Sequence, residues 1–256
     1  GKNFEKINRS TAEKRKRPDF SQRKQHIKVA VIGAGPAGLT AASELVQKGY
    51  SVSVFESSSK PGGMLQLCIP SFRLPRDCLD AEISQIKDSG VEIKTNVKVG
   101  EDTKIEHLWQ QGFKAVLVSV GAHKTRKLNA EGEDLNGVYD ALDFLQQANK
   151  NGTAKIGTHV AVVGGGNVAI DSARTALRQG VKDVTILYRR SKDEMPANPY
   201  EVREAEEEGI KIQFLVAPKR VLGEKGSAKS LECVKMELCE PDETGRKKPR
   251  IIDGSE

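Results

Sequence analysis

The sequence of 256 residues predicts an α/β fold in which two strand–helix–strand units follow one another along the chain. Each unit has a short apolar segment, a glycine-rich turn, a segment with helical periodicity and a second apolar segment. The glycine-rich turns lie at residues 33–38 and 164–169. A helical crossover of this length joins parallel strands with a right-handed connection, so each unit predicts part of an open parallel sheet.

The composition is that of a folded chain with a sizeable core, because 37% of the residues are hydrophobic and 30% are charged. No apolar run approaches the ~18 residues of a membrane-spanning helix. The four cysteines, at positions 68, 78, 233 and 239, do not have the spacing of a CxxC motif, a zinc finger or a disulfide framework. We therefore expect a reducing compartment, the cytoplasm.

The net charge of +6 comes from the N-terminal tail, since residues 1–28 hold ten lysines and arginines against three acidic residues. The rest of the chain is nearly neutral. The basic run at residues 14–17 is typical of a nuclear-localisation or polyanion-binding segment, which leaves nucleic-acid binding as one alternative. No aromatic residue is interleaved with this run for stacking on bases. We expect residues 1–26 to be a poorly ordered tail or linker that binds no nucleic acid.

The first unit contains all three elements in order. Residues 26–32 are rich in β-branched side chains and end at Gly33, which is typical of a buried strand. Residues 36–48 repeat apolar side chains at helical spacing and stop at Gly49. Residues 51–56 then form a second predicted strand.

The second unit repeats this order. A strand is predicted at residues 158–163, a helix at 167–179 that ends at Gly180, and a second strand at 183–188. The chain thus contains two dinucleotide-fold units in tandem.

The segments between and after the two units are less regular. The other expected elements are helices near residues 76–89, 139–149 and 198–208, and strands near 91–99, 114–120, 210–216 and 229–239. The pair Asn151-Gly152 is a turn signal. We therefore predict a first domain at 27–152 and a second at 153–256.

The first glycine turn has the GxGxxG pattern between a strand and a helix, which is the fingerprint of a dinucleotide site. It consists of Gly33, Ala34, Gly35, Pro36, Ala37 and Gly38. The first glycine permits the tight turn, the second lets a pyrophosphate approach the backbone, and the third lets the helix pack on the strand. Glu56 ends the second strand, where a carboxylate binds an adenosine ribose and repels a 2′-phosphate.

The second glycine turn has the GxGxxA form of the same fingerprint. It consists of Gly164, Gly165, Gly166, Asn167, Val168 and Ala169. Its second strand ends in Arg189 and Arg190 instead of a carboxylate, and guanidinium groups suit a phosphate. We therefore predict that this site binds NADPH in preference to NADH. Lys192 is close enough in sequence to assist the two arginines, and the alternative is that it is simply exposed.

Two dinucleotide sites of opposite preference suggest a flavin, FAD, that exchanges electrons with NADPH. Hydride transfer between these cofactors needs no acid or base from the protein, so we expect no catalytic side chain. The four histidines are scattered and show no metal-ligand spacing, so we expect no metal.

Several further motifs resemble the glutamate synthase small-subunit family, to which the flavin and NADPH domains of dihydropyrimidine dehydrogenase also belong. They are Lys60-Pro61-Gly62-Gly63-Met64, residues 69–75 (IPSFRLP), residues 132–138 (GEDLNGV), residues 141–145 (ALDFL), the second glycine turn with Asp171, and residues 188–197 (YRRSKDEMPA). The resemblance extends from about residue 27 to the last residue.

The resemblance implies a pyridine nucleotide-disulfide oxidoreductase-like fold in which an NADPH domain is inserted into an FAD domain. It also implies that Gly62, Gly63 and Met64 border the flavin, and that Arg73 reaches FAD. Further implied contacts are Val99, through its backbone, at the adenine end, and Gly121 near the flavin. The alternative for Arg73 is a salt bridge that braces its loop.

The chain departs from the family pattern in three places. The family has a cysteine-rich iron–sulfur segment before the first strand, and residues 1–26 contain no cysteine. The family also continues beyond residue 256 to complete both domains, and this chain begins with Gly1. We therefore expect an incomplete C-terminal part, and iron–sulfur clusters on a partner.

The leading hypothesis is an NADPH-dependent FAD oxidoreductase module, similar to the glutamate synthase small subunit, that passes electrons to an iron–sulfur partner. A reductase that runs in reverse, from ferredoxin to NADP, is one alternative. A non-catalytic fragment that binds a nucleotide or a partner is another. A disulfide reductase is disfavoured because the cysteine spacings provide no dithiol.

Overall fold

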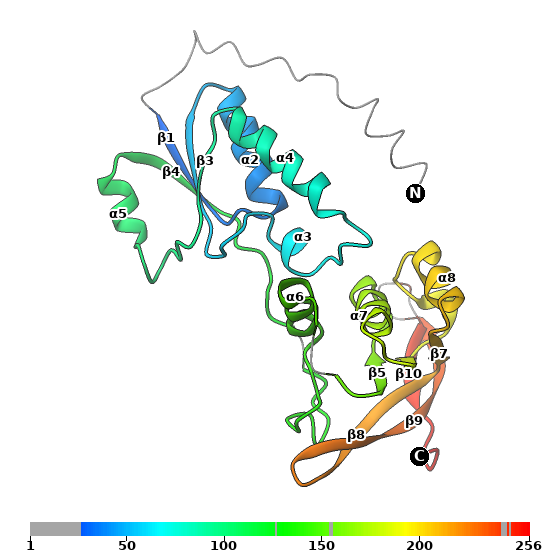
Figure 1. The fold of residues 1–256 in the computed structure, drawn as a ribbon. Coiled ribbons are helices and arrows are strands. Elements are labelled where there is room, and N and C mark those ends of the chain that lie inside the picture. The colour runs from blue at the N-terminus through cyan, green and yellow to red at the C-terminus, as the bar shows by residue number, and fades with distance from the viewer. Residues whose placement is uncertain (1–26, 126, 154–155, 242–244, 246) are drawn as a thin grey trace. The chain divides into compact units, whose positions relative to one another are not determined.

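The computed structural model describes residues 27–125, 127–153, 156–241, 245 and 247–256 (Figure 1). These residues form two compact units. The first contains the described residues up to Gln66 together with Leu74–Ala122, and the second contains Leu67–Arg73 together with the described residues from His123 onward. The predicted N-terminal tail lies outside the described residues.

The units divide the chain at positions other than the predicted boundary after residue 152. Helix α6 (Ala141–Asn151) belongs to the second unit, and so does the short excursion Leu67–Arg73. Gly152 does end α6, in a left-handed conformation with φ 75°. The turn signal at Asn151-Gly152 therefore marks the end of a helix within one unit, because a glycine C-cap stops a helix wherever it occurs.

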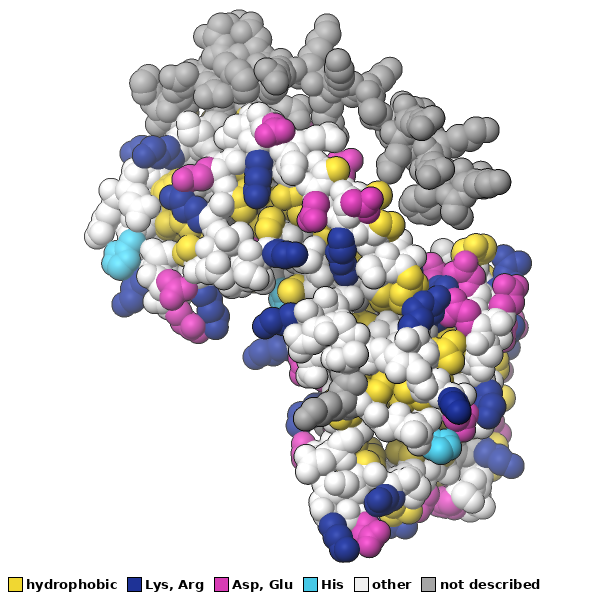
Figure 2. Space-filling view, viewed as in Figure 1, with side chains coloured by type: hydrophobic (Ala, Val, Ile, Leu, Met, Phe, Trp, Pro, Cys, Tyr) yellow, Lys and Arg dark blue, Asp and Glu magenta, His cyan; other side chains and the backbone are white. Residues whose placement is uncertain are grey.

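Charged side chains cover the visible face of each unit without segregating by sign. Figure 2 shows lysine and arginine side chains intermingled with aspartate and glutamate side chains over both units. This mixture agrees with the nearly neutral charge that the sequence has outside its first 28 residues.

The first unit contains a sheet of four parallel strands in the order β3-β2-β1-β4. The strands are β1 (Lys28–Ile32), β2 (Ser51–Phe55), β3 (Glu92–Lys94) and β4 (Phe113–Val118). Ile32, the last residue of β1, stands opposite Phe55 of β2 and Val118 of β4. The carboxyl ends of these strands therefore meet at one edge of the sheet, where the first glycine turn begins.

β3 is shorter than the predicted strand at 91–99. Asn96 has a left-handed φ of 56°, which an extended strand does not allow, so regular pairing ends before it. Val99 forms only an isolated bridge with Thr103.

Four helices accompany this sheet. They are α2 (Pro36–Gln47), α3 (Met64–Leu67), α4 (Arg76–Asp88) and α5 (Ile105–Gln110). The sequence predicts α2 and α4 but not α3 and α5. Helical periodicity becomes recognisable over about 11 residues or more, and these two helices are shorter than that.

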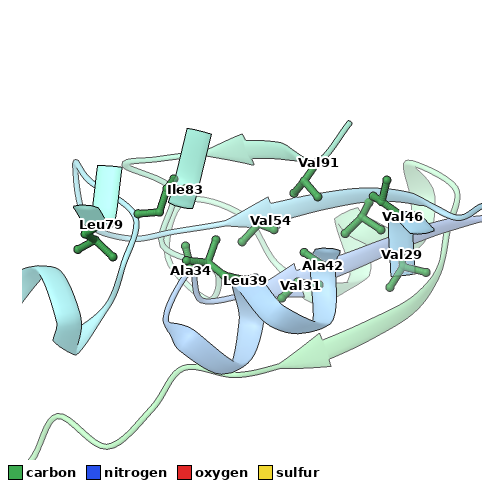
Figure 3. Close-up of a cluster of buried hydrophobic side chains, with 11 residues drawn as sticks. Val29, Val31, Ala34, Leu39, Ala42, Val46, Val54, Leu79, Ile83 and Val91 are labelled. Atoms are coloured by element: carbon green, nitrogen blue, oxygen red, sulfur yellow. The ribbon is translucent and has the colours of Figure 1, made fainter. Parts of the chain in front are cut away.

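Both faces of the sheet are covered by apolar side chains. Alternate strand residues such as Val31 and Val54, both fully buried, pack on one face with Leu39 of α2 and Ile83 of α4 (Figure 3). The intervening residues point to the other face, where a second cluster forms. It contains Ala30, Ile32, Phe55, Leu108 and Phe113. Burial on both faces is what an all-parallel sheet requires.

The second unit contains a sheet of three parallel strands in the order β5-β6-β7. The strands are β5 (His159–Val163), β6 (Asp183–Tyr188) and β7 (Lys211–Phe214), and the helices besides α6 are α7 (Asn167–Arg178) and α8 (Pro199–Glu207), with a 3₁₀ turn at Lys192–Glu194. Ile170 of α7 and Ile186 of β6 are fully buried. The strand–helix–strand order β5-α7-β6 is the one that the sequence predicts.

An antiparallel sheet with the order β10-β9-β8 follows β7. Its strands are β8 (Val216–Glu224), β9 (Ser227–Pro241) and β10 (Lys247–Ile251). The sequence predicts only β9. Lys225 and Gly226, which connect β8 to β9, both have positive φ, 51° and 79°, as a two-residue hairpin turn requires. A lysine at the first turn position is a poor signal for such a hairpin, since asparagine or aspartate is usual there.

We expect the substitution Ile186→Ala to lower the free energy of unfolding by about 2–5 kcal/mol, because it removes a fully buried side chain and leaves a cavity. Denaturant-induced unfolding measures this change. The control is Ile251→Ala, where the side chain is 52% exposed and we expect a change of less than about 0.5 kcal/mol. Equal effects of the two substitutions would contradict the placement of Ile186 in the core.

Candidate functional site

The first glycine turn joins β1 to α2 by very close backbone packing. Gly33 has φ 102°, and a Cβ atom there would lie 2.5 Å from the backbone oxygen of Ser119. A Cβ atom on Gly38 would lie 1.9 Å from the backbone oxygen of Gly33. The fold itself therefore requires glycine at the first and third positions of the fingerprint.

Gly35, the second glycine of the fingerprint, has no such role in the fold. Its φ of −78° suits any residue, and the nearest atom to a Cβ atom there would be the Cα atom of Gly63, at 3.9 Å. Gly35 is also the N-cap of α2, and no side chain caps the free amides of that helix end. The space beside Gly35 thus suits a ligand that approaches the backbone, and an anion suits the helix N-terminus.

Glu56 lies directly against this turn, at the end of β2. Its side chain is buried, and its Oε2 atom accepts a hydrogen bond of 2.8 Å from the backbone amide of Ala34. Its Oε1 atom accepts a hydrogen bond of 2.7 Å from the amide of Ser58. The structure therefore brings the predicted carboxylate to the glycine turn, and its contact with a ribose stays a prediction.

The segment Gly62-Gly63-Met64 also meets the first turn. The amide of Gly62 donates a hydrogen bond of 2.7 Å to the oxygen of Ala34, and a Cβ atom on Gly63 would lie 2.7 Å from the Cα atom of Gly35. Both glycines have positive φ, 125° and 55°. Two segments that are distant in sequence thus border the same space.

The other two predicted residues of the first unit lie after strand segments. Gly121, with φ 73°, follows β4 shortly after Ser119, whose amide donates to the oxygen of Ile32 at the end of β1. Val99 packs against the cluster that contains Phe55 and Phe113. Their contacts with a flavin stay predictions.

The second glycine turn repeats the arrangement of the first. Gly164 has φ 136°, and a Cβ atom on Gly165 would lie 2.5 Å from the ring of Tyr188. A Cβ atom on Gly166 would have no neighbour within 4 Å, and Gly166 is the N-cap of α7 without a side-chain cap. In this turn too, the glycine at the helix N-terminus is the one that has free space where a side chain would lie.

The loop after β6 folds onto this second turn. The hydroxyl of Tyr188 donates to the oxygen of Glu194 at 2.7 Å, and the amide of Ala197 donates to the oxygen of Gly165 at 3.1 Å. Oδ1 of Asn167 accepts a hydrogen bond of 3.0 Å from the amide of Asn198. Val168, the next residue of α7, is 42% exposed.

Arg189 and Arg190 follow β6 directly. Arg189 is exposed, and Nε of Arg190 donates a hydrogen bond of 2.9 Å to the backbone oxygen of Lys247 on β10. Lys192 forms an ion pair of 3.1 Å with Glu206. The side chain of Lys192 is therefore paired with α8 in the structure.

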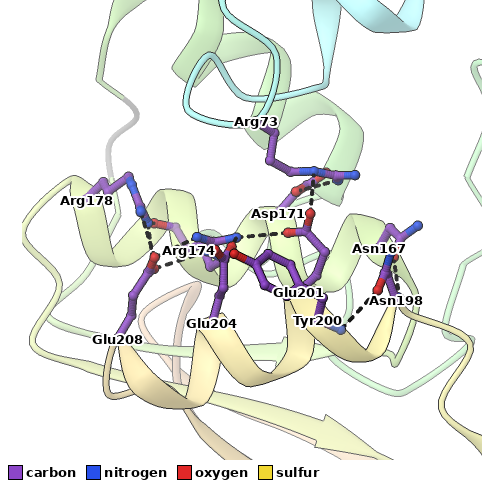
Figure 4. Close-up of polar contacts among 10 residues, drawn as sticks. All are labelled: Arg73, Asn167, Asp171, Arg174, Arg178, Asn198, Tyr200, Glu201, Glu204 and Glu208. Carbon is purple, nitrogen blue, oxygen red and sulfur yellow. Dashed lines mark hydrogen bonds and ion pairs between the residues drawn. The ribbon is translucent and has the colours of Figure 1, made fainter. Parts of the chain in front are cut away.

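A cluster of ion pairs covers α7 and α8 (Figure 4). Nη1 of Arg73 lies 2.7 Å from Oδ2 of Asp171, and Nε of Arg73 lies 3.3 Å from Glu201. Burial raises the pKa of Asp171, although Arg73 opposes this shift. The structure thus gives Arg73 the bracing salt bridge of the alternative interpretation, and its contact with FAD stays a prediction from the resemblance.

Arg174 is the centre of the same cluster. Its side chain is only 5% exposed, and its guanidinium forms ion pairs with Glu201, Glu204 and Glu208 at 2.9, 2.9 and 2.6 Å. The ring of Phe72 lies 5.0 Å from the guanidinium carbon of Arg174. The sequence contains no local signal for this cluster, because its members come from three separate segments.

Two kinds of feature are absent from the part of the chain that the structure describes. No helix there combines the length and the apolar character that crossing a lipid bilayer requires. No group of three or more histidine, cysteine or acidic side chains there is placed to hold a metal ion.

The family model described as pyridine nucleotide-disulphide oxidoreductase matches residues 27–243. The chain is also 47% identical over 232 residues to the NADP(+)-dependent formate dehydrogenase subunit beta of Moorella thermoacetica, covering 90% of this chain and 33% of that protein. It is 38% identical over 252 residues to the small chain of the NADPH-type glutamate synthase of Azospirillum brasilense, covering 94% and 52%. The chain therefore spans about a third to a half of the length of these relatives.

Solved structures share the fold at lower identity. Mycobacterium tuberculosis FprA in complex with NADPH superposes with a TM-score of 0.80 at 21% identity, over 91% of this chain and 68% of that chain. Lactococcus lactis thioredoxin reductase gives a TM-score of 0.61 at 21% identity, over 88% and 74%. These matches confirm the predicted α/β fold, and the curated relatives confirm the resemblance that the motifs indicate.

We expect Glu208 to contribute to stability in a pH-dependent way. The hydrogen bond from Arg178, followed by that from Arg174, lowers the pKa of Glu208 from 4.5 to about 2. Because the folded-state pKa lies below the unfolded-state value, the stabilisation is present above about pH 4.5 and is lost as the pH falls towards 2. Glu208→Gln should therefore flatten the fall in unfolding free energy across this window, as measured by urea unfolding at a series of pH values.

The matched control for this prediction is Glu207→Gln. Glu207 is exposed and forms no ion pair with any described residue. We expect its pH profile to follow that of the unsubstituted protein. A Glu208→Gln profile that also follows the unsubstituted protein would show that the ion pairs of Glu208 do not stabilise the fold.

Proposed function

The chain belongs to the pyridine nucleotide-disulphide oxidoreductase family, and from this premise we propose that it is the FAD- and NADPH-binding part of a flavin oxidoreductase. Its relatives include proteins named as NADPH-type glutamate synthase small chain and NADP(+)-dependent formate dehydrogenase subunit beta. The observation that carries the proposal is the open space beside one glycine in each of the two turns, Gly35 and Gly166.

The first turn fits the adenosine diphosphate part of FAD. The uncapped amides of α2 suit a pyrophosphate, and the buried carboxylate of Glu56, held at the turn by Ala34, suits ribose hydroxyls and repels a 2′-phosphate. The residues of the first unit that we propose for the FAD site are Gly33, Gly35, Pro36, Ala37, Gly38, Glu56, Gly62, Gly63, Met64, Val99 and Gly121.

The second turn fits NADPH. The uncapped amides of α7 suit a pyrophosphate, and the two arginines at the end of β6 suit a 2′-phosphate. The residues that we propose for this site are Gly164, Gly165, Gly166, Asn167, Val168, Arg189 and Arg190.

The protein's part in the reaction is binding and orientation. With both cofactors bound, NADPH would supply a hydride and FAD would supply the acceptor for it. The glycine turns anchor the phosphates, and the residues at the ends of β2 and β6 discriminate between the two adenosines. We propose no acid, base or nucleophile among the side chains.

We propose that the electrons go to a partner protein or domain with iron–sulfur clusters. The resemblance supports this step, and the names of the relatives mark them as subunits of larger enzymes. The four cysteines are free in the structure, and Cys233 and Cys239 are six residues apart on one strand, too far for a dithiol. Free thiols also support the proposed cytoplasmic location.

We expect the purified chain, supplied with FAD, to show a bound-flavin absorption spectrum that bleaches with anaerobic NADPH and poorly with NADH. The reason is that the two turns and the arginine pair together select FAD and NADPH. Bound flavin without bleaching would favour the alternative of a non-catalytic nucleotide-binding fragment. The absence of bound flavin in this chain would contradict the proposed function.

We expect Gly166→Ala to weaken NADP⁺ binding at least about tenfold while the melting temperature stays nearly unchanged. The new methyl group occupies the space beside the α7 amides, whereas the φ of −91° and the absence of neighbours within 4 Å leave the fold unstrained. Isothermal titration calorimetry measures the affinity.

The control is Gly157→Ala, at a position outside the turn where a Cβ atom would meet only a backbone oxygen at 3.8 Å. This variant should bind NADP⁺ as the unsubstituted protein does. Undiminished binding by Gly166→Ala would show that the second turn does not hold the nucleotide.

A further inference from the structure

We propose that Lys247, at the start of β10, is a specificity-determining residue that binds the 2′-phosphate of NADPH together with Arg189 and Arg190. The inference rests on the proposed function and names a residue that the glycine fingerprint does not predict. Lys247 follows Arg190 by 57 residues and belongs to a strand outside the parallel sheet.

The first observation is that β10 begins at the carboxyl end of β6. Nε of Arg190 donates a hydrogen bond of 2.9 Å to the backbone oxygen of Lys247. The oxygen of Arg190 accepts a hydrogen bond of 3.2 Å from the amide of Leu215, and the oxygen of Leu215 accepts one of 2.8 Å from Met236 on β9. The antiparallel sheet is thus tied to the strand end that discriminates between NADPH and NADH in this fold.

The second observation is the place of the Lys247 ammonium group. The hydrogen bond from Ser191 lowers the pKa of Glu194, and the positive charge of Lys247 lowers it further. Glu194 lies in the loop that follows Arg189 and Arg190, so the charge of Lys247 acts at this loop. The hydrogen bond between Arg190 and Lys247 also places the start of β10 beside this loop, so the geometry and the lowered pKa of Glu194 agree.

The third observation is that these three cations have no ion pair with any residue that the structure describes, whereas basic residues on neighbouring elements do. Lys192 pairs with Glu206, and Lys211 pairs with Asp183. The hydrogen bond to Lys247 occupies Nε of Arg190 and leaves its two Nη groups for an anion. None of these three cations thus forms an ion pair with a described residue, although the charge of Lys247 also acts on Glu194.

The chemistry of the 2′-phosphate fits this arrangement. A phosphate accepts forked hydrogen bonds from guanidinium groups and binds an ammonium group as a point charge. NADH carries a neutral hydroxyl group at the same position, so it gains nothing from Lys247. Lys247 therefore has two roles at this site: its backbone oxygen orients Arg190, and its side chain adds charge.

The test compares the full chain with its Lys247→Ala variant, with 2′,5′-ADP and 5′-AMP as probes in isothermal titration calorimetry. The two probes differ only in the 2′-phosphate. We expect Lys247→Ala to weaken 2′,5′-ADP binding about tenfold and to leave 5′-AMP binding unchanged, since one charge-assisted contact is lost. The variant keeps the backbone oxygen that orients Arg190, and Lys247 is exposed, so the melting temperature should not change.

Two further variants complete the design. Lys248→Ala removes the same charge from the neighbouring residue of β10 and should leave 2′,5′-ADP binding unchanged. Lys247→Arg keeps the charge and should restore most of the affinity that Lys247→Ala loses.

The outcomes separate this inference from the proposed function. If the unsubstituted chain binds 2′,5′-ADP and Lys247→Ala binds it equally well, the inference is wrong and the proposed function stands. If Lys247→Ala and Lys248→Ala weaken binding equally, the effect is one of general charge and the inference is again wrong. If the unsubstituted chain binds neither 2′,5′-ADP nor NADP⁺, the proposed NADPH site is wrong and the inference falls with it.

Discussion

Both units depend on a helix that packs against the backbone of the strand before it. In the first unit, a Cβ atom on Gly38 would lie 1.9 Å from the backbone oxygen of Gly33. Helix α2 can therefore pack this close to β1 only because residue 38 is a glycine. In the second unit Ala169 takes this place, and its Cβ atom would lie 3.6 Å from one on Gly164. Because the helix starts so close to the strand, its free amides lie at the carboxyl edge of the sheet, where anions bind in this fold.

The glycines of the two turns have different physical reasons, and Gly164 is required by its positive φ of 136°. Gly33, Gly38 and Gly165 are glycines because a side chain would meet protein atoms within 3 Å. Gly35 and Gly166 have ordinary backbone angles and open surroundings, so the fold gives no reason for them. A ligand that lies against the backbone would explain why these two positions are glycines. This contrast is the main support for the two proposed dinucleotide sites.

The cluster around Arg174 binds the segment Leu67–Arg73 to the rest of the second unit. Leu67–Arg73 joins this unit through Arg73, which pairs with Asp171, and through Phe72, whose ring lies 4.0 Å from the guanidinium carbon of Arg178. Burying Asp171 costs desolvation energy, which Arg73 offsets only in part by a charge-assisted hydrogen bond, since the pKa of Asp171 stays raised. A buried pair of this kind is weak evidence for stability, but removing one partner leaves an unpaired buried charge.

The sequence by itself determined the features that depend on near neighbours along the chain. The spacing of apolar residues predicted β1, α2, β2, α7 and β6 within a residue or two, and the two fingerprints predicted where the glycine turns lie. Short or unusual elements were beyond this kind of prediction, because α5 has fewer than two turns and the β8–β9 hairpin turns through Lys225 instead of a typical turn residue.

Only the tertiary structure decided the contacts between distant segments. Arg73 meets Asp171 across 98 residues, and Arg190 meets Lys247 across 57. Neither pair has a local pattern, because a hydrogen bond or an ion pair depends on distances in space and leaves the intervening sequence unconstrained.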